Sequence, residues 1–159
     1  MDGVDAYLQP AAHALVQARE DLARVGNGLA TTQLWLQPNG AASVAYHLRH
    51  LGGSLDRLLT YARREQLSEP QLTALKSETD PNAPRHELPV LVDEARRAID
   101  SALEQIRTTR RDELLEHREV GRGRLPSTVL GLLTHAAEHT ARHVGQAITT
   151  SKIVAADFG

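Results

Sequence analysis

Histidine is the residue type whose number and spacing in this sequence indicate chemistry. The chain of 159 residues contains eight histidines and no cysteine, so neither a thiolate metal site nor a cysteine nucleophile is available. His135, His139 and His143 follow one another at intervals of four. On a helix each would lie about 40° from the next, which places His143 within the apolar stripe of its segment, His139 at the margin and His135 further out.

A pair of histidines on one apolar helical face points to a shared metal ion. A neutral ring in a core needs partners for both nitrogens, and an unsatisfied group costs roughly 1–3 kcal/mol. Imidazole nitrogens at positions i and i+4 can both reach one divalent ion at about 2.0–2.1 Å. A lone histidine is more often an ordinary hydrogen-bonded residue, whereas His139 and His143 together predict a metal site.

A third ligand is expected from a neighbouring helix, where His47 and His50 are the candidates. On a helical wheel, His47 lies about 60° from the centre of that helix's apolar stripe and His50 about 120° from it. The apolar pattern therefore favours His47. A bundle helix faces two neighbours, however, so His50 at the edge of the stripe could also point into the centre of the bundle.

Four segments with an apolar period of three to four residues must position these histidines. They cover about residues 4–25, 43–64, 89–106 and 126–150, and a shorter helix is predicted at about 69–76. Ser43 and Ser68 are suitable N-caps, and Pro89 and Pro126 suit the first turn of a helix. The polar stretch 110–124 is predicted to be a loop, because it ends in a Gly-Arg-Gly-Arg run.

The composition fits an all-α protein with a single domain over residues 1–159. Hydrophobic residues make up 41% of the chain and aromatic residues 3%, so Leu, Val, Ile and Ala must fill the core. With no strand pattern, we predict a four-helix bundle. The net charge of −2 gives no general attraction to nucleic acid or anionic membranes, and no apolar run could cross a bilayer. Without a signal peptide, the expected compartment is the cytoplasm.

Two stretches carry a more specific pattern, TTQLWLQPNGAASVAYHLRHLGGSLDRLL and HTARHVGQ. Both resemble the DinB/YfiT-like family of predicted metalloenzymes. That family has a Ser-Val or Ser-Ile pair at the start of its second helix and a ligand histidine seven residues after the serine, which from Ser43 is His50. Its last helix has a motif close to H-x-x-x-H-R-G-Q, matched here by His139, His143, Gly145 and Gln146. Val144 replaces the arginine of that motif.

The resemblance implies a four-helix bundle in up-down-down-up order, frequently a homodimer, with a three-histidine site for zinc, nickel or a similar divalent ion. The ligands that it carries over are His50, His139 and His143. His47 and His135 then become neighbours of the site. The remaining histidines have no helical companions and are expected at the surface: His13, His86 and His117.

Other sites are less well supported. A zincin needs Glu directly after the first histidine of its pair, and Ala136 occupies that position. A ferritin-like di-iron site needs Glu-x-x-His pairs, which the sequence lacks. The arginines of segment 107–124 interleave with Asp and Glu, which is typical of a solvated loop. The alternative is that Arg122 or Arg124 guides an anionic substrate to the metal.

Three neutral imidazoles leave a divalent ion its full charge and at least one open position, as in catalytic sites. We therefore expect a metal-dependent transferase or hydrolase that activates water or a low-molecular-weight thiol for a small-molecule substrate. The resemblance favours thiol transfer, because relatives include thiol-dependent transferases and isomerases. No residue stands out as the general base. The alternative is a non-catalytic metal-binding or stress-associated module that uses the bundle as a scaffold.

Overall fold

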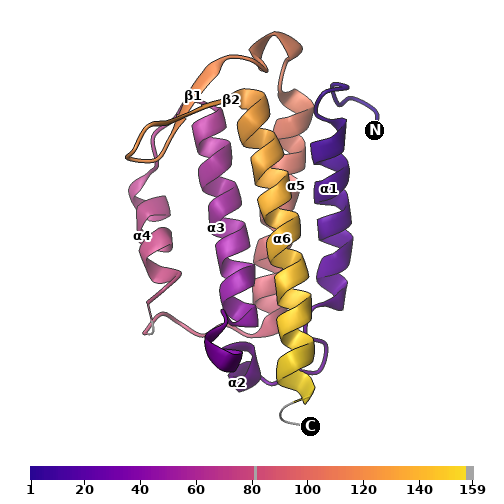
Figure 1. Ribbon diagram of the computed structural model, residues 1–159, viewed down its shortest axis with the longest axis vertical. Helices are drawn as coiled ribbons and strands as arrows, with labels where there is room; N and C mark the ends of the chain where they lie inside the picture. Colours follow the sequence, from indigo (N-terminus) through magenta and orange to yellow (C-terminus); the bar gives the residue numbers. More distant parts are fainter. Residues whose placement is uncertain (81, 157–159) are drawn as a thin grey trace.

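Most of the chain is helical in the computed structural model, which describes residues 1–80 and 82–156 (Figure 1). This confirms the prediction of a mostly helical fold. The long helices are α1 (Gln9–Asp21), α3 (Val44–Ala62), α5 (Leu88–Thr108) and α6 (Val129–Ala156). The shorter helices are α2 (Thr31–Leu34) and α4 (Glu69–Ser77), and 3-10 turns cover Leu22–Arg24, Pro38–Gly40 and Arg111–Glu113.

The long helices enclose one apolar core. Helix α3 packs against α5 and α6, and α1 packs against the same two helices from the other side. In Figure 1, α1 and α6 run downwards while α3 and α5 run upwards, and α4 stands beside α3. The core consists mainly of aliphatic side chains with almost no exposed surface, among them Leu8, Leu15, Leu48, Leu55, Ile99, Leu133 and Ala147. No helix in the described part of the chain combines the length and apolarity that a membrane crossing needs.

The polar signals at the helix starts act as the sequence predicts. The Ser43 hydroxyl accepts a hydrogen bond from the Tyr46 backbone N–H at 3.1 Å and so caps α3. Ser68 and Gln71 form a reciprocal capping box at the start of α4. Helix α1 is shorter than the predicted segment 4–25 at both ends: residues 2–3 and 6–8 form turns before Gln9, and Leu22–Arg24 form a 3-10 turn before Gly26, whose φ is +60°.

The segment predicted to be a loop contains a β-hairpin, so this part of the prediction was wrong. Strand β1 (His117–Val120) pairs antiparallel with β2 (Leu125–Thr128), with Glu119 opposite Pro126. Pro126 is therefore in a strand rather than in the first turn of a helix, and α6 begins at Val129. A proline is tolerated there because a strand of a two-stranded ribbon has a free edge. The strands are short and only Arg118 in them is buried, so they leave little apolar alternation in the sequence.

Arg118 attaches this hairpin to the bundle. Its side chain is only 8% exposed, and its Nε donates a hydrogen bond to the Ala62 carbonyl at 2.7 Å. The last carbonyls of a helix have no partner within the helix, so the arginine satisfies one of those at the end of α3. Its other nitrogens donate to the His117 carbonyl and to the Glu116 carboxylate. The hairpin therefore closes the end of the bundle at which α3 finishes and α6 begins.

Replacing Arg118 with alanine should destabilise the protein, because the Ala62 carbonyl loses its partner. We expect the free energy of unfolding to fall by about 1–3 kcal/mol. Arg122 is exposed in the turn of the same hairpin, and Arg122→Ala should change it by less than about 0.5 kcal/mol. Urea unfolding followed by circular dichroism measures both values, and equal stabilities of the two variants would contradict the assignment.

Candidate metal centre

Helices α3 and α6 bring His50, His139 and His143 together, although His50 and His139 are 89 residues apart in the sequence. The Nε2 atoms of His50 and His139 are 3.1 Å apart. One ring nitrogen from each of the three histidines lies within 4.8 Å of the other two. The ring centroid of His143 is 4.7 Å from that of His50 and 4.4 Å from that of His139. The three rings thus share one small space at the seam between the two helices.

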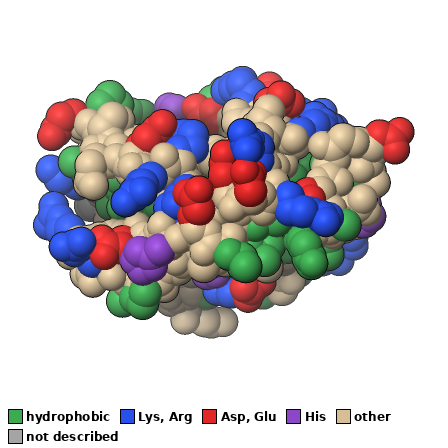
Figure 2. All heavy atoms as spheres, turned by 90° about the horizontal axis from the view of Figure 1, so that it is seen from above, with side chains coloured by type: hydrophobic (Ala, Val, Ile, Leu, Met, Phe, Trp, Pro, Cys, Tyr) green, Lys and Arg blue, Asp and Glu red, His purple; other side chains and the backbone are tan. Residues whose placement is uncertain are grey.

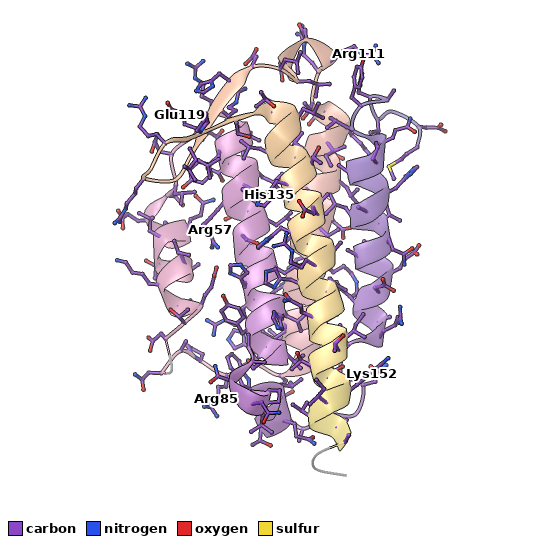
Figure 3. All side chains as sticks on the ribbon, in the orientation of Figure 1. Arg57, Arg85, Arg111, Glu119, His135 and Lys152 are labelled. Atoms are coloured by element: carbon purple, nitrogen blue, oxygen red, sulfur yellow. The ribbon has the colours of Figure 1, made fainter. Side chains whose placement is uncertain are left out.

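The burial of the α6 histidines follows the helical wheel. His143 is buried, His139 is half-buried and His135 is exposed, with 51% of its side chain accessible. His135 is labelled in Figure 3, beside the seam between α3 and α6. Its ring centroid is 5.7 Å from that of His139, and its Nδ1 lies 3.7 Å from a Glu138 carboxylate oxygen. His135 is therefore a solvent-exposed neighbour of the cluster.

His47 and His50 occupy different places around the cluster. The apolar pattern favoured His47, and His47 is indeed buried, with 6% of its surface exposed. Its Nδ1 lies 3.0 Å from Nδ1 of His143, which places it behind that ring. The group of converging nitrogens includes His50 rather than His47. Tyr46 stacks on the His50 ring with a centroid distance of 5.3 Å and an interplanar angle of 6°.

The spacing of the cluster fits a divalent ion. Two nitrogens that are each about 2.0–2.1 Å from a tetrahedrally coordinated ion lie roughly 3.3 Å apart, close to the separation of the His50 and His139 Nε2 atoms. Nδ1 of His50 faces Glu78, and Nδ1 of His143 faces His47, so each of these rings has its Nε2 left to bind an ion. Nδ1 of His139 is buried and has no hydrogen-bond partner among the described residues. The cluster therefore has the donor set and the spacing of a metal site.

Burial keeps the rings of His139 and His143 neutral. It lowers the pKa of His143 to about 3, with the neighbouring His139 and His50 acting in the same direction. Burial, followed by the charge of His50, lowers the pKa of His139 to about 4. The same two causes lower the pKa of His47. At neutral pH the rings of His139 and His143 can therefore offer lone pairs to a cation without first losing a proton.

Glu78 and Arg57 complete the surroundings of His50, and sequence analysis missed both. Glu78 follows directly after α4, and its Oε2 lies 2.7 Å from Nδ1 of His50. Arg57 donates to the same carboxylate, with 2.5 Å between Nη1 and Oε1. Burial alone would raise the pKa of Glu78, but the hydrogen bonds from His50 and Arg57 outweigh it and lower that pKa. No residue of α4 is buried, so the sequence before Glu78 has no apolar pattern that would predict a contact with His50.

A comparison with protein families agrees with this geometry. The model of the DinB superfamily matches residues 14–147, a stretch that includes α3, the hairpin and the three converging histidines. The chain belongs to the DinB superfamily. The resemblance predicted from the two motifs is thereby confirmed. A comparison with curated proteins finds no match.

This DinB protein departs from the family motif at one position whose surroundings are now visible. Val144, which replaces the arginine, is only 2% exposed and belongs to the apolar core. Gln146, which matches the motif, is exposed. Position 144 therefore contributes apolar packing in this chain, and no positive charge lies there.

The arginine-rich segment is mainly a network of surface ion pairs. Arg111 pairs with Asp5 and Arg124 with Glu119, and Arg107, Arg110 and Arg118 also have acidic partners. Arg122 and Arg124 line a cavity of about 900 Å³ between the hairpin, the end of α3 and α4. Figure 2, which looks onto the hairpin end, shows basic side chains on this end of the molecule, interspersed with acidic ones. None of the three converging histidines lines the cavity, so the geometry gives no support to an anion route from these arginines to the metal.

The histidines predicted to lie at the surface do so. His13 is exposed, and the side chains of His117 and His86 are 66% and 42% accessible. His86 also accepts a hydrogen bond at its backbone carbonyl from the Trp35 indole N–H, 3.4 Å away. None of them contributes a nitrogen to the converging group.

The metal-free protein should lose stability as the pH falls below 6.5, the ordinary pKa of histidine. The unfolded chain takes up protons on His139 and His143 near pH 6.5, whereas the folded protein resists protonation down to the pKa values of about 4 and 3. Because the unfolded state then binds more protons, each ring lowers the free energy of unfolding by at most about 1.4 kcal/mol per pH unit in this window. Above pH 6.5 these rings should have no effect.

Urea unfolding in the presence of a chelator, repeated at about pH 7, 6 and 5, measures this slope. His143→Gln provides the comparison, since glutamine does not titrate and its slope should be smaller. Identical slopes in the two proteins would show that His143 is not held neutral by burial.

Proposed function

We propose that this DinB protein binds one divalent metal ion, zinc or nickel, through His50, His139 and His143. The observation that carries the proposal is the convergence of three ring nitrogens within 4.8 Å of one another. Imidazole is a preferred ligand of both metals, and the chain offers no thiolate that would compete for them. Membership of the DinB superfamily supports the same conclusion.

We further propose that the bound ion makes the protein an enzyme acting on a small molecule, with water or a low-molecular-weight thiol as the nucleophile. A divalent ion held by three neutral imidazoles supplies Lewis acidity, which lowers the pKa of a coordinated water or thiol. The chain's own residues hold the ion and orient the rings. The His50 side chain is 20% accessible and His139 is half-buried, so this side of the cluster is partly open to solvent. His143, on the other side, is buried against His47.

The rival function is a metal-binding module without catalysis. Such a site would be expected to have a fourth protein ligand and to be closed to solvent. His47 is the nearest further histidine, but its Nδ1 faces Nδ1 of His143 rather than the space shared by the three rings. The partial exposure of His50 and His139 also favours an open position. These two features support the enzymatic proposal over a structural site.

The proposal also covers the order of the helices, the oligomeric state and the cellular location of the protein. The helix directions in Figure 1 support a four-helix bundle in up-down-down-up order. By resemblance to the family, we propose a homodimer located in the cytoplasm. Sedimentation of the purified protein tests the dimer independently of the metal site.

Metal analysis of protein purified without an affinity tag tests the site. We expect about one zinc or nickel ion per chain, and a loss of affinity of at least about tenfold when any one of His50, His139 or His143 is changed to alanine. His117→Ala removes an exposed histidine on the hairpin and should bind as the wild type does. Full metal binding by the three site variants would contradict the ligand assignment.

A separate assay tests the reaction. The metal-loaded protein is incubated with a panel of small thiols and electrophiles, and with hydrolysable esters and amides. We expect turnover that disappears on chelation and in His139→Ala but persists in His117→Ala. A loaded protein that is silent across the panel would favour the non-catalytic module.

A further inference from the structure

His50 is the only one of the three converging histidines whose second nitrogen contacts a carboxylate in the described chain. Nδ1 of His50 and Oε2 of Glu78 are 2.7 Å apart, and the Glu78 side chain is only 7% exposed. The same carboxylate receives Nη1 of Arg57 at 2.5 Å and Nη2 at 3.4 Å. Figure 3 labels Arg57 in the space between α4 and α3. A partly buried chain of contacts thus runs from Arg57 through Glu78 to His50.

We propose that Glu78 is a positioning residue: its carboxylate holds the Nδ1 proton of His50 and thereby aims the Nε2 lone pair of that ring at the metal. The inference rests on the proposed metal site. It adds a residue from outside α3 and α6, in the connection between α4 and α5, to the machinery of that site.

Glu78 acts through His50 rather than as a ligand itself. The two nitrogens of an imidazole lie on different sides of the ring, so a group bound to Nδ1 cannot also reach an ion bound at Nε2. An ionised carboxylate accepts hydrogen bonds but donates none, so the contact fixes the tautomer of His50 with its proton on Nδ1. The other nitrogen then carries the lone pair that a cation requires, and the negative charge behind the ring makes that lone pair more basic.

Arg57 keeps the carboxylate in the form that this role needs. An isolated buried carboxyl group would tend to take up a proton and could then donate rather than accept. Arg57 places Nη1 at Oε1 and Nη2 at Oε2 of this carboxylate, so the charge of Glu78 has a fixed cationic partner. The Arg57 side chain is itself only 11% exposed, so this ion pair is partly shielded from solvent.

Three contacts fix α4 along α3 and so place Glu78 opposite His50. The Gln71 side-chain amide donates to Asp56 at 2.8 Å and to Thr60 at 2.7 Å, and Arg49 donates to the Ser77 hydroxyl at 3.2 Å. Glu78 continues the helical backbone of α4 for one residue, and its N–H donates to the Ala74 carbonyl. The carboxylate is therefore presented from a backbone that several side chains hold in register.

Gly53 provides the space that the carboxylate occupies. A Cβ atom added at Gly53 would lie closer than 3.0 Å to both Oε1 of Glu78 and Nη1 of Arg57. At the adjacent Gly52, the nearest atom to an added Cβ is the Cβ of Ala98 at 3.9 Å, an ordinary contact. The two glycines lie side by side in α3, yet only one of them faces the ion pair. Gly53→Ala and Gly52→Ala therefore form a matched pair of variants, because replacing either glycine with alanine raises the helix propensity of α3 by the same amount.

The experiment compares Gly53→Ala, Gly52→Ala, Glu78→Ala and Glu78→Gln with the wild type. Zinc affinity is measured by competition with a chelator, and folding is checked by thermal denaturation. We expect Gly53→Ala and Glu78→Ala to bind zinc roughly 10–100-fold more weakly. Gly52→Ala should bind as the wild type does. Glu78→Gln keeps an acceptor for His50 but not the charge, so its affinity should lie between those of Glu78→Ala and the wild type.

A second readout uses the metal-free protein. A Nδ1 proton held by a buried carboxylate exchanges slowly and gives a resolved imidazole signal in proton–nitrogen correlation spectra. We expect this His50 signal in the wild type and in Gly52→Ala, and its loss in Glu78→Ala and Gly53→Ala. Spectra of cobalt-substituted protein should change in the same variants, which a loss of general stability would not cause.

The outcomes separate this inference from the function on which it rests. If the wild type binds no metal, the proposed function fails, while the His50 proton signal still decides whether Glu78 fixes that ring. If the wild type binds zinc and Glu78→Ala and Gly53→Ala bind it equally well, the positioning role is wrong although the metal site stands. A well-folded Glu78→Ala that retains the slowly exchanging His50 proton would overturn the inference as well.

Discussion

The packing of α3 against α6 is the contact on which the rest of the structure depends. Both helices contribute leucines and alanines to the core, and the same seam holds the imidazoles of His50, His139 and His143. The apolar contacts supply the free energy that holds the rings close together. The polar rings oppose this packing, because each loses hydrogen bonds to water and gains an incomplete set of protein partners. The seam is therefore stable because of its leucines and can bind an ion because of its histidines.

The surroundings of the three rings differ, and the difference follows from how each approaches the seam. His143 lies deepest and has another histidine behind it, His50 has an ionised carboxylate behind it, and Nδ1 of His139 has no partner among the described residues. Among the described residues, His50 is the one of the three rings that contacts Glu78, which directly follows α4. The carboxylate charge next to the cluster therefore acts on the ring of His50, which is 20% accessible, through the 7% exposed side chain of Glu78.

The sequence was sufficient for the existence of the four long helices and α4, and for the depth of each α6 histidine, because these follow from a period of 3.6 residues and from capping residues. The choice between His47 and His50 could not be made from periodicity, since the more buried ring is not the one that joins the converging group; the family motif selected His50. The hairpin was missed because its strands have too few apolar residues to alternate. Glu78 could not have been found, because its role depends on where α4 lies along α3, and contacts between distant residues determine that. Gly53 resembles any other helical glycine until its neighbour across the helix interface is known.

The long separation between His50 and His139 has a consequence for the order of events during folding. Eighty-nine residues must be spanned before their rings can meet, and closing so long a loop costs entropy that only the finished seam repays. On the ribosome, His139 emerges after most of the chain, so a nascent protein has α3 in place well before its partner exists. An ion that needs all three rings would consequently be captured late. Its uptake would report that α3 and α6 have packed together.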